Sequence, residues 1–239
     1  MGSWETLVAR LRTPLRLPIL YYHEIGPERG KHVVHPDDFA AQMDWLAGEG
    51  YGVIGLDALV AAYAGRRALP VRPVLVTFDD GRSGVLRHAL PALARHGFPS
   101  TLYAVTDWLD GAAVPEVERY SGFLGWKDLA SLRAGGMTIG SHTRSHRTLK
   151  KLPPHEVERE IVDSKRRLED ALGEPVHHFS YPKGRSTPHA RRVARRAGYH
   201  TAVSTGERWN GRFARLHELG RLRVDGRESL GDFAARLAG

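Results

Sequence analysis

Two carboxylates stand at the end of a short apolar run, in the segment Val74-Leu75-Val76-Thr77-Phe78-Asp79-Asp80-Gly81. The run reads as a buried strand, and its final glycine permits a tight turn. Neighbouring side chains on an extended chain point to opposite sides, so Asp79 and Asp80 are expected to take different roles. One can bind a metal ion while the other handles a proton. Alone, this tripeptide more often caps a helix or forms a turn.

A second polar segment, Ser141-His142-Thr143-Arg144-Ser145-His146, follows the short run Thr138-Ile139-Gly140. Two histidines four positions apart can face one cation if the segment coils by one turn. Two imidazoles with one carboxylate form the open three-ligand site that is typical of catalytic zinc. The alternative is a polar loop with two solvated histidines, in a chain that has thirteen. Because both segments follow strands, their side chains would share one rim, and the expected ligands are His142, His146 and one of the two carboxylates.

The chain contains no Cys, so a metal here must be held by His, Asp or Glu. Such donors accept one divalent ion, with Zn²⁺ expected first and Co²⁺, Ni²⁺, Mn²⁺ or Fe²⁺ as alternatives. A third segment, Phe179-Ser180-Tyr181-Pro182-Lys183-Gly184, reads as a strand end followed by a turn. Turns of this kind can aim a backbone N–H at a developing oxyanion.

The elements that must position these residues alternate along the chain as short apolar runs and longer helical periods, which favours an α/β fold on a mainly parallel sheet. Seven strands suggest a closed or nearly closed barrel. Helices are expected over Asp37–Gly50, Arg82–Gly97, Pro154–Gly173 and Thr187–Gly198, each ending at a glycine. Thr106–Gly125 is predicted to be one long irregular segment. The expected strands are Pro18–Tyr22, Tyr51–Ile54, Pro73–Phe78, Ser100–Val105, Met137–Ile139, His178–Tyr181 and Thr201–Val203.

Length and composition indicate a single globular domain: 239 residues, 41% hydrophobic and 26% charged. The formal net charge is +8, and 29 of the 35 basic residues are arginines spread along helical stretches. This distribution favours solvated helix faces over a patch for an anionic partner. No nucleic-acid-binding motif accompanies it, so nucleic acid is not an expected partner.

The first 24 residues have neither the long apolar stretch nor the cleavage site of a secretory signal. No run approaches the ~18 apolar residues of a transmembrane helix, and none is expected. The sequence as it stands predicts a cytoplasmic protein, or an extracellular or periplasmic one if a leader was removed. Basic amphipathic character in Trp4–Arg16 leaves peripheral contact with an anionic membrane open.

The three polar segments, in this order, resemble the polysaccharide deacetylases of carbohydrate esterase family four. The resemblance runs from about Leu17 to Val224 and includes Gly125-Trp126-Lys127-Asp128-Leu129 and Ala197-Gly198-Tyr199. It implies an N-terminal extension, residues 1–16, before a catalytic domain, residues 17–239, with a distorted (β/α)7 barrel. The implied reaction is hydrolysis of the acetamide of N-acetylglucosamine units, with Asp80, His142 and His146 on the cation. Asp79 would take a proton from water, and a main-chain N–H near Lys183 would stabilise the oxyanion.

Two departures from the family pattern concern the catalytic acid and base. The third motif usually begins with an Arg that braces the catalytic Asp, and this chain has Ser180 there, so the brace must come from elsewhere. The usual C-terminal His motif is replaced by Glu218-Leu219-Gly220-Arg221-Leu222-Arg223-Val224, with His217 slightly early. The opening Leu20-Tyr21-Tyr22-His23-Glu24-Ile25 instead resembles a circularly permuted subgroup that includes poly-N-acetylglucosamine deacetylases. His23 is therefore the candidate acid for the leaving amine; the alternative is a histidine that only hydrogen-bonds in the barrel mouth.

The expected substrate is an N-acetylated sugar or polysaccharide. Tyr22, Trp108, Trp126 and Tyr181 are candidate stacking platforms, although aromatic residues more often belong to the core. The predicted substrate-binding set is Tyr181, Pro182, Lys183 and Trp126. Alternatives are an amidase of a small cytoplasmic sugar conjugate or non-sugar amide, and a non-catalytic glycan-binding barrel. The absence of a Gly-x-Ser-x-Gly motif and of Cys argues against an acyl-enzyme route.

Overall fold

The computed structural model describes residues 16–111 and 122–238. The main sheet is parallel and follows the order β10-β1-β5-β6-β7-β8-β9, with the short β4 also paired to β5. A separate two-stranded sheet joins β2 to β3. The strands are β1 (Ile19–Tyr22), β2 (Glu24–Ile25), β3 (Val33–Val34), β4 (Gly52–Val53), β5 (Pro73–Phe78), β6 (Ser100–Ala104), β7 (Met137–Ser141), β8 (His178–Ser180), β9 (Thr201–Val203) and β10 (Leu222–Arg223).

The sheet curls so that one segment, Leu219–Arg223, borders both of its edges. Leu219 forms a parallel bridge with Val203 at the end of β9, and β10, which pairs with β1, begins three residues further on. The result is the distorted seven-stranded α/β barrel that the sequence predicts. Its carboxyl-end rim is where the polar segments after β1, β5, β7 and β8 converge.

Alternation along the strands separates the barrel interior from the layer under the helices. On β5, Val74, Val76 and Phe78 pack outward with the larger core cluster. Leu75 packs on the other side, in the cluster that contains Ile19 and Tyr103. Because the parity continues past the strand, Asp79 enters the barrel on the same side as Leu75.

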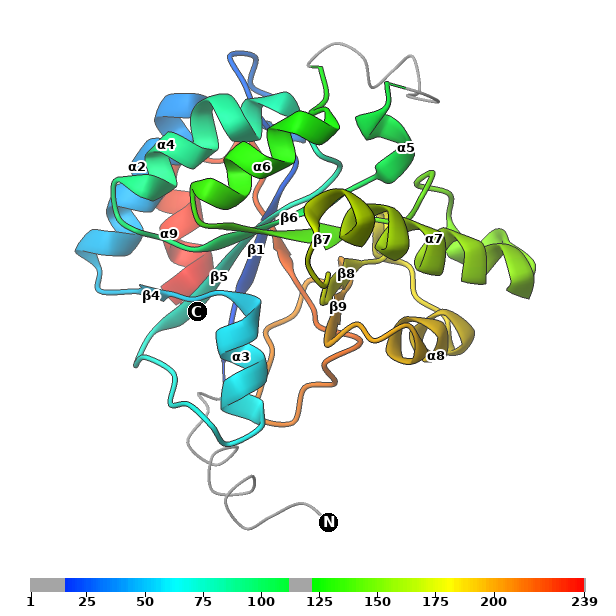
Figure 1. The fold of residues 1–239 in the computed structure, drawn as a ribbon. Coiled ribbons are helices and arrows are strands. Elements are labelled where there is room, and N and C mark those ends of the chain that lie inside the picture. The colour runs from blue at the N-terminus through cyan, green and yellow to red at the C-terminus, as the bar shows by residue number, and fades with distance from the viewer. Residues whose placement is uncertain (1–15, 112–121, 239) are drawn as a thin grey trace.

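Helices surround the curled sheet, with α2, α4 and α6 along one side and α7 and α8 along another (Figure 1). Pro36 opens α2, and Thr187 caps α8 by accepting a hydrogen bond from the Ala190 amide (3.1 Å). The helices are α2 (Pro36–Gly48), α3 (Leu56–Tyr63), α4 (Leu90–Ala94) after the π-helical turn η1 (Val85–Ala89), α5 (Thr106–Leu109), α6 (Trp126–Ala134), α7 (Pro154–Leu172), α8 (Pro188–Arg196) and α9 (Leu230–Ala238), with 3₁₀ turns η3 (Leu149–Lys151) and η4 (Pro182–Gly184).

All seven predicted strands are present, β5 and β9 with the predicted bounds and the others with shifted ends. The four predicted helices are also present with shifted ends, and the one predicted over Arg82–Gly97 consists of η1 followed by α4. The prediction of one irregular segment over Thr106–Gly125 is wrong at its start, because Thr106–Leu109 forms α5. Residues 112–121 of that segment lie outside the described residues, as do residues 1–15 of the predicted N-terminal extension and of the proposed amphipathic stretch. Across the described chain, no helix has the length and apolar character needed to cross a membrane.

Candidate active site and metal centre

A pocket of about 340 Å³ opens at the carboxyl ends of the barrel strands. All five of the predicted catalytic and metal-binding side chains line this pocket, because each lies in a segment that follows a strand and parallel strands end at the same rim. His32, Arg82 and Thr205 also line it, and no sequence pattern singled them out. The predicted residues that it brings together are His23 after β1, Asp79 and Asp80 after β5, His142 and His146 after β7, and Lys183 after β8.

Asp80, His142 and His146 form a compact set of donors whose ligand atoms all lie within 4.8 Å of one another. Asp80 Oδ1 is 3.7 Å from His142 Nε2 and 3.6 Å from His146 Nε2. Tetrahedral ligands at ~2.1 Å from a zinc ion would be about 3.4 Å apart, so the spacing fits a divalent cation with little movement. Among the described residues this is the one such group of three or more His, Cys, Asp or Glu side chains.

The two histidines are suited to ligation because both are held neutral. Burial lowers the pKa of His142, and burial together with the neighbouring His142 lowers the pKa of His146 to about 3. His142 Nδ1 lies 2.8 Å from the Ser180 carbonyl oxygen and therefore donates to it, which leaves Nε2 as the lone-pair donor. A cation would then meet a correctly oriented imidazole.

Asp79 makes a bidentate ion pair with Arg221 at the floor of the pocket. Arg221 donates from its two terminal nitrogens to Oδ1 (2.8 Å) and Oδ2 (2.6 Å) of Asp79. Both side chains are buried, Arg221 completely. Burial alone would raise the pKa of Asp79, but the charge of Arg221 and its hydrogen bonds to the carboxylate hold it well below its usual range. Asp79 is therefore ionised at neutral pH.

Arg221 is the brace that the sequence did not identify. One of its terminal nitrogens also donates to Ser180 Oγ (3.0 Å), the hydroxyl of the residue that replaces the Arg of the family pattern. Its Nε donates to the Ser204 carbonyl (3.1 Å), and its guanidinium lies 4.5 Å from the ring centre of Tyr21. The sequence did contain a signal for this role, because the stretch where the family usually has a His motif carries two arginines here.

His23 lines the same pocket next to His32, with their ring centres 4.5 Å apart. Burial lowers the pKa of His23 to about 3, although the charge of Asp79 acts in the other direction. His23 is therefore neutral near pH 7. His217, noted for its place near the end of the chain, lies outside the pocket lining and bonds through Nε2 to the Tyr199 carbonyl (2.8 Å).

The predicted substrate-binding residues do not all reach this pocket. Lys183 lines it, whereas Tyr181 and Pro182 are buried beside it and are not lining residues. Tyr181 donates its hydroxyl to the His217 carbonyl (3.1 Å). Trp126 begins α6 and donates from Nε1 to Asp110.

Two further aromatic candidates belong to the protein interior. Tyr22 is fully buried and donates to Gln42 (2.9 Å). Trp108 is 2% exposed, and its ring centre lies 4.9 Å from that of His146. Trp108 therefore packs against a candidate metal ligand, and its ring is too buried to stack against a sugar.

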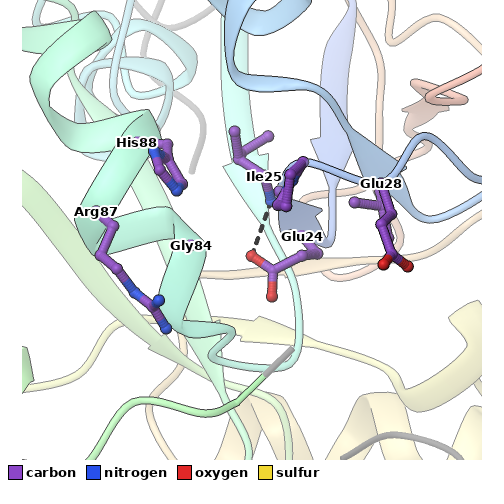
Figure 2. A pocket seen from close by; sticks show the side chains of 9 residues that line it. Glu24, Ile25, Glu28, Gly84, Arg87 and His88 are labelled. Carbon is purple, nitrogen blue, oxygen red and sulfur yellow. Dashed lines mark hydrogen bonds between the residues drawn. The ribbon is translucent and has the colours of Figure 1, made fainter. Parts of the chain in front are cut away.

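A second cavity of about 300 Å³ lies behind the β2–β3 sheet (Figure 2). Glu24 and Val33 face it, while His23 and His32, one position earlier in each strand region, face the first pocket. Glu24 accepts a hydrogen bond from the Ile25 amide (2.9 Å), and η1 contributes Arg87 from the other wall. The two cavities therefore share the β2–β3 sheet as a wall.

The barrel rim thus carries an Asp-His-His donor set that could hold a metal ion, with a buried Asp beside it. The chain belongs to the polysaccharide deacetylase family: the family model "Polysaccharide deacetylase" matches residues 66–202, more than half of its length. The matched region carries Asp79, Asp80, His142, His146 and Lys183. Arg221 and His23 lie outside it.

Proteins of similar sequence belong to the same family by their names. YxkH of Bacillus subtilis (strain 168), provisionally named a polysaccharide deacetylase, is 28% identical over 211 residues, which cover 88% of this chain and 72% of YxkH. The poly-β-1,6-N-acetyl-D-glucosamine N-deacetylase of Escherichia coli (strain K12) is 30% identical over 77 residues. That match covers 32% of this chain and 12% of the much longer Escherichia coli protein.

Solved structures show the same fold. The Streptococcus pyogenes deacetylase PplD, in complex with acetate, superposes with a TM-score of 0.82 at 24% identity, covering 94% of this chain and 99% of PplD. IcaB from Ammonifex degensii gives a TM-score of 0.81 at 24% identity, covering 95% and 99% of the two chains. Nearly the whole chain thus adopts a known architecture.

Proposed function

We propose that this chain is a metal-dependent hydrolase that removes N-acetyl groups from N-acetylglucosamine-type sugars or polysaccharide and releases acetate. Membership of the polysaccharide deacetylase family supports deacetylation. The observation that carries the proposal is the pocket in which the Asp80, His142 and His146 donors adjoin the Arg221-braced Asp79. A glycan-binding barrel without catalysis would have no use for that brace.

Asp80, His142 and His146 would hold one divalent cation, with Zn²⁺ as the first candidate. The same donors accept Co²⁺, Ni²⁺, Mn²⁺ or Fe²⁺. When bound, such a cation supplies Lewis acidity to the acetamide carbonyl and to a water molecule. His142 is prepared for this position by its hydrogen bond to Ser180, and the turn that follows it brings His146 to the same point.

Asp79 would accept the proton of the attacking water. Each of its oxygens receives one hydrogen bond from Arg221, and a carboxylate oxygen has a second lone pair for a further contact. The guanidinium fixes the direction of the carboxylate and keeps it ionised. Asp79 is then poised as a general base without needing to be deprotonated first.

His23 would deliver a proton to the leaving amine. Because the resting imidazole is neutral, that proton must enter with the attacking water and reach His23 after Asp79 has accepted it. This accounting balances amide hydrolysis, in which one water proton ends on the amine. A main-chain N–H near Lys183, together with that exposed side chain at the pocket wall, would orient the acetyl oxygen.

The test is acetate release from N-acetylglucosamine oligomers by protein as isolated, after chelation, and after Zn²⁺ or Co²⁺ is restored. We expect release to vanish with the chelator and to return with metal. Comparison of the monosaccharide, short oligomers and polymer would separate a polysaccharide substrate from a small sugar conjugate. Correctly folded, metal-loaded protein that releases no acetate from any of them would contradict the proposal.

Asp79→Asn tests the role of the base, because it keeps the shape of the side chain and removes its capacity to take a proton. We expect metal content to stay at the wild-type level while kcat falls by about 10²–10⁴-fold, the usual contribution of a general base. Asp110→Asn, outside the pocket, should leave both quantities unchanged. Near-normal turnover in Asp79→Asn would assign the base elsewhere.

A further inference from the structure

The turn between the two candidate histidine ligands has an unfavourable backbone conformation. Thr143 has φ of +68° and His146 has φ of +60°. A β-branched residue such as Thr is a clear outlier in this region, because its side chain crowds the backbone. Conformations of this kind persist only where surrounding groups hold them.

Two separate segments hold the turn through its backbone groups. On the carbonyl side, Thr106 N–H donates to the Thr143 oxygen (3.2 Å) and Asp107 N–H donates to the Arg144 oxygen (2.8 Å). On the amide side, the Arg144 and Ser145 N–H groups both donate to Oε2 of Glu160, at 3.0 and 2.9 Å. The Ser145 hydroxyl donates to the other oxygen of the same carboxylate.

Glu160 is an unusual member of its helix. It lies on the inner face of α7 beside Val157 and Ile161 and is 3% exposed. Glu156 and Glu158, on the same helix, make ion pairs with arginines nearer the surface. A buried carboxylate is costly unless it is hydrogen-bonded, and the donors of this one come from the turn.

The two histidines depend on this turn to different degrees. His142 is fixed from neighbouring strands, because its N–H donates to the Ala104 oxygen (2.8 Å) and its ring donates to Ser180. The backbone of His146 belongs to the turn itself, where its N–H donates to Thr143 Oγ1 (3.1 Å), and its ring packs against Trp108. Loss of the turn conformation would move His146 and leave His142 in place.

We propose that Glu160 is a positioning residue for the metal centre: its carboxylate holds the Thr143–His146 turn and so sets the place of His146. This inference rests on the proposed function for the identity of the metal site. Glu160 touches neither ligand ring, and it acts on the cation through the backbone. Outer-shell partners of metal ligands typically change metal affinity by about 10–100-fold.

The experiment is titration of the metal-free full chain with Zn²⁺ and with Co²⁺, measuring affinity and the visible Co²⁺ spectrum. Glu160→Asp keeps the charge and withdraws the carboxylate by one methylene, so we expect Zn²⁺ affinity to fall by about 10–100-fold with an altered Co²⁺ spectrum. Glu160→Gln keeps an acceptor for both amides and can donate to the Ser145 hydroxyl, so it should remain within about tenfold of wild type. Glu158→Gln is the matched surface control and should bind as wild type does.

Wild-type affinity and spectrum in folded Glu160→Asp would overturn the proposal. If that variant does not fold, Ser145→Ala removes one hydroxyl bond to the same carboxylate and should give a smaller loss of affinity; no loss would overturn the proposal equally. Failure of the proposed function looks different. In that case the wild-type chain would bind metal without releasing acetate, and Glu160→Asp would still weaken metal binding.

Discussion

At the scale of single residues, the site depends on a carboxylate and a guanidinium that lie far apart in the sequence. Arg221 is separated from Asp79 by 142 positions, and their pairing buries both charges. A planar guanidinium satisfies both carboxylate oxygens at once, which fixes direction as well as charge. The ring faces of Tyr21 and Tyr103 lie 4.5 and 5.7 Å from the same guanidinium and limit its movement.

Replacement of Arg221 by Lys tests whether this geometry matters beyond the charge. Lys keeps a positive charge but cannot bond both oxygens in parallel, so Asp79 would lose its fixed direction. We expect kcat for acetate release to fall by about 10²-fold, the scale of a small misplacement of a catalytic group, with metal content unchanged. Arg196→Lys, an exposed ion-pair partner of Glu158, should behave as wild type. Unchanged kcat in Arg221→Lys would show that only the positive charge at this position matters, and that the geometry of the guanidinium does not.

At the scale of elements, the active site is formed by turns that follow the strands, and the backbone of these turns is sterically constrained. The turn after β8 contains Lys183 and Gly184, both at positive φ. A Cβ on Gly184 would lie 1.8 Å from Thr205 Oγ1 and 2.3 Å from the Thr205 amide nitrogen. Thr205 lines the catalytic pocket, so glycine at this position lets two walls of the pocket approach each other.

Gly184→Ala and Gly173→Ala form a matched pair for this turn. Gly173 ends α7 at φ of +68° with open space around it, so Ala there should cost only the left-handed strain of about 1–2 kcal/mol and leave kcat/KM unchanged. Gly184→Ala adds overpacking of about 1–3 kcal/mol and displaces Lys183 or Thr205, so kcat/KM should also fall. Chemical denaturation and acetate release check both effects. Equal stability and activity in the two variants would contradict the close approach.

The elements also show which parts of this protein a sequence can predict. Strand β5 and the segment after it were predictable because a mostly apolar run ends abruptly in two carboxylates, and strand ends share a rim. Lys183 was predictable on the same grounds. Arg221 was not, because its segment is only two residues of strand and its partner is distant in sequence. Helix α3 was missed because its signal, eight mostly apolar residues without a side-chain cap, is short.

At the scale of the whole molecule, the site concentrates neutral imidazoles in a buried place. Burial lowers the pKa of His23 and His146 to about 3, against an ordinary value of 6.5, and also lowers that of His142. In the unfolded chain these histidines take up protons near pH 6.5. The folded, metal-free protein therefore becomes less stable as the pH falls, because its histidines bind protons less readily than those of the unfolded chain.

The sign of this effect follows from proton linkage. A group with a lowered folded pKa contributes stability that is present above its unfolded pKa and is lost as the pH falls toward the folded value. For His146 the window runs from pH 6.5 to about 3. Between pH 7.5 and 5, one such group costs up to about 2 kcal/mol of unfolding free energy.

Denaturation of the metal-free protein at pH 7.5 and pH 5 measures this loss. We expect lower stability at pH 5, and His146→Gln should reduce the difference between the two pH values by up to about 2 kcal/mol, since Gln does not titrate. His155→Gln, at an exposed position on α7, should leave the difference as in wild type. Saturating Zn²⁺ should raise wild-type stability more at pH 7.5 than at pH 5, because protons and the cation compete for the same nitrogens. A pH dependence unchanged by His146→Gln would show that this imidazole is open to solvent protons in the folded state, and that the site is not the closed, neutral donor set described here.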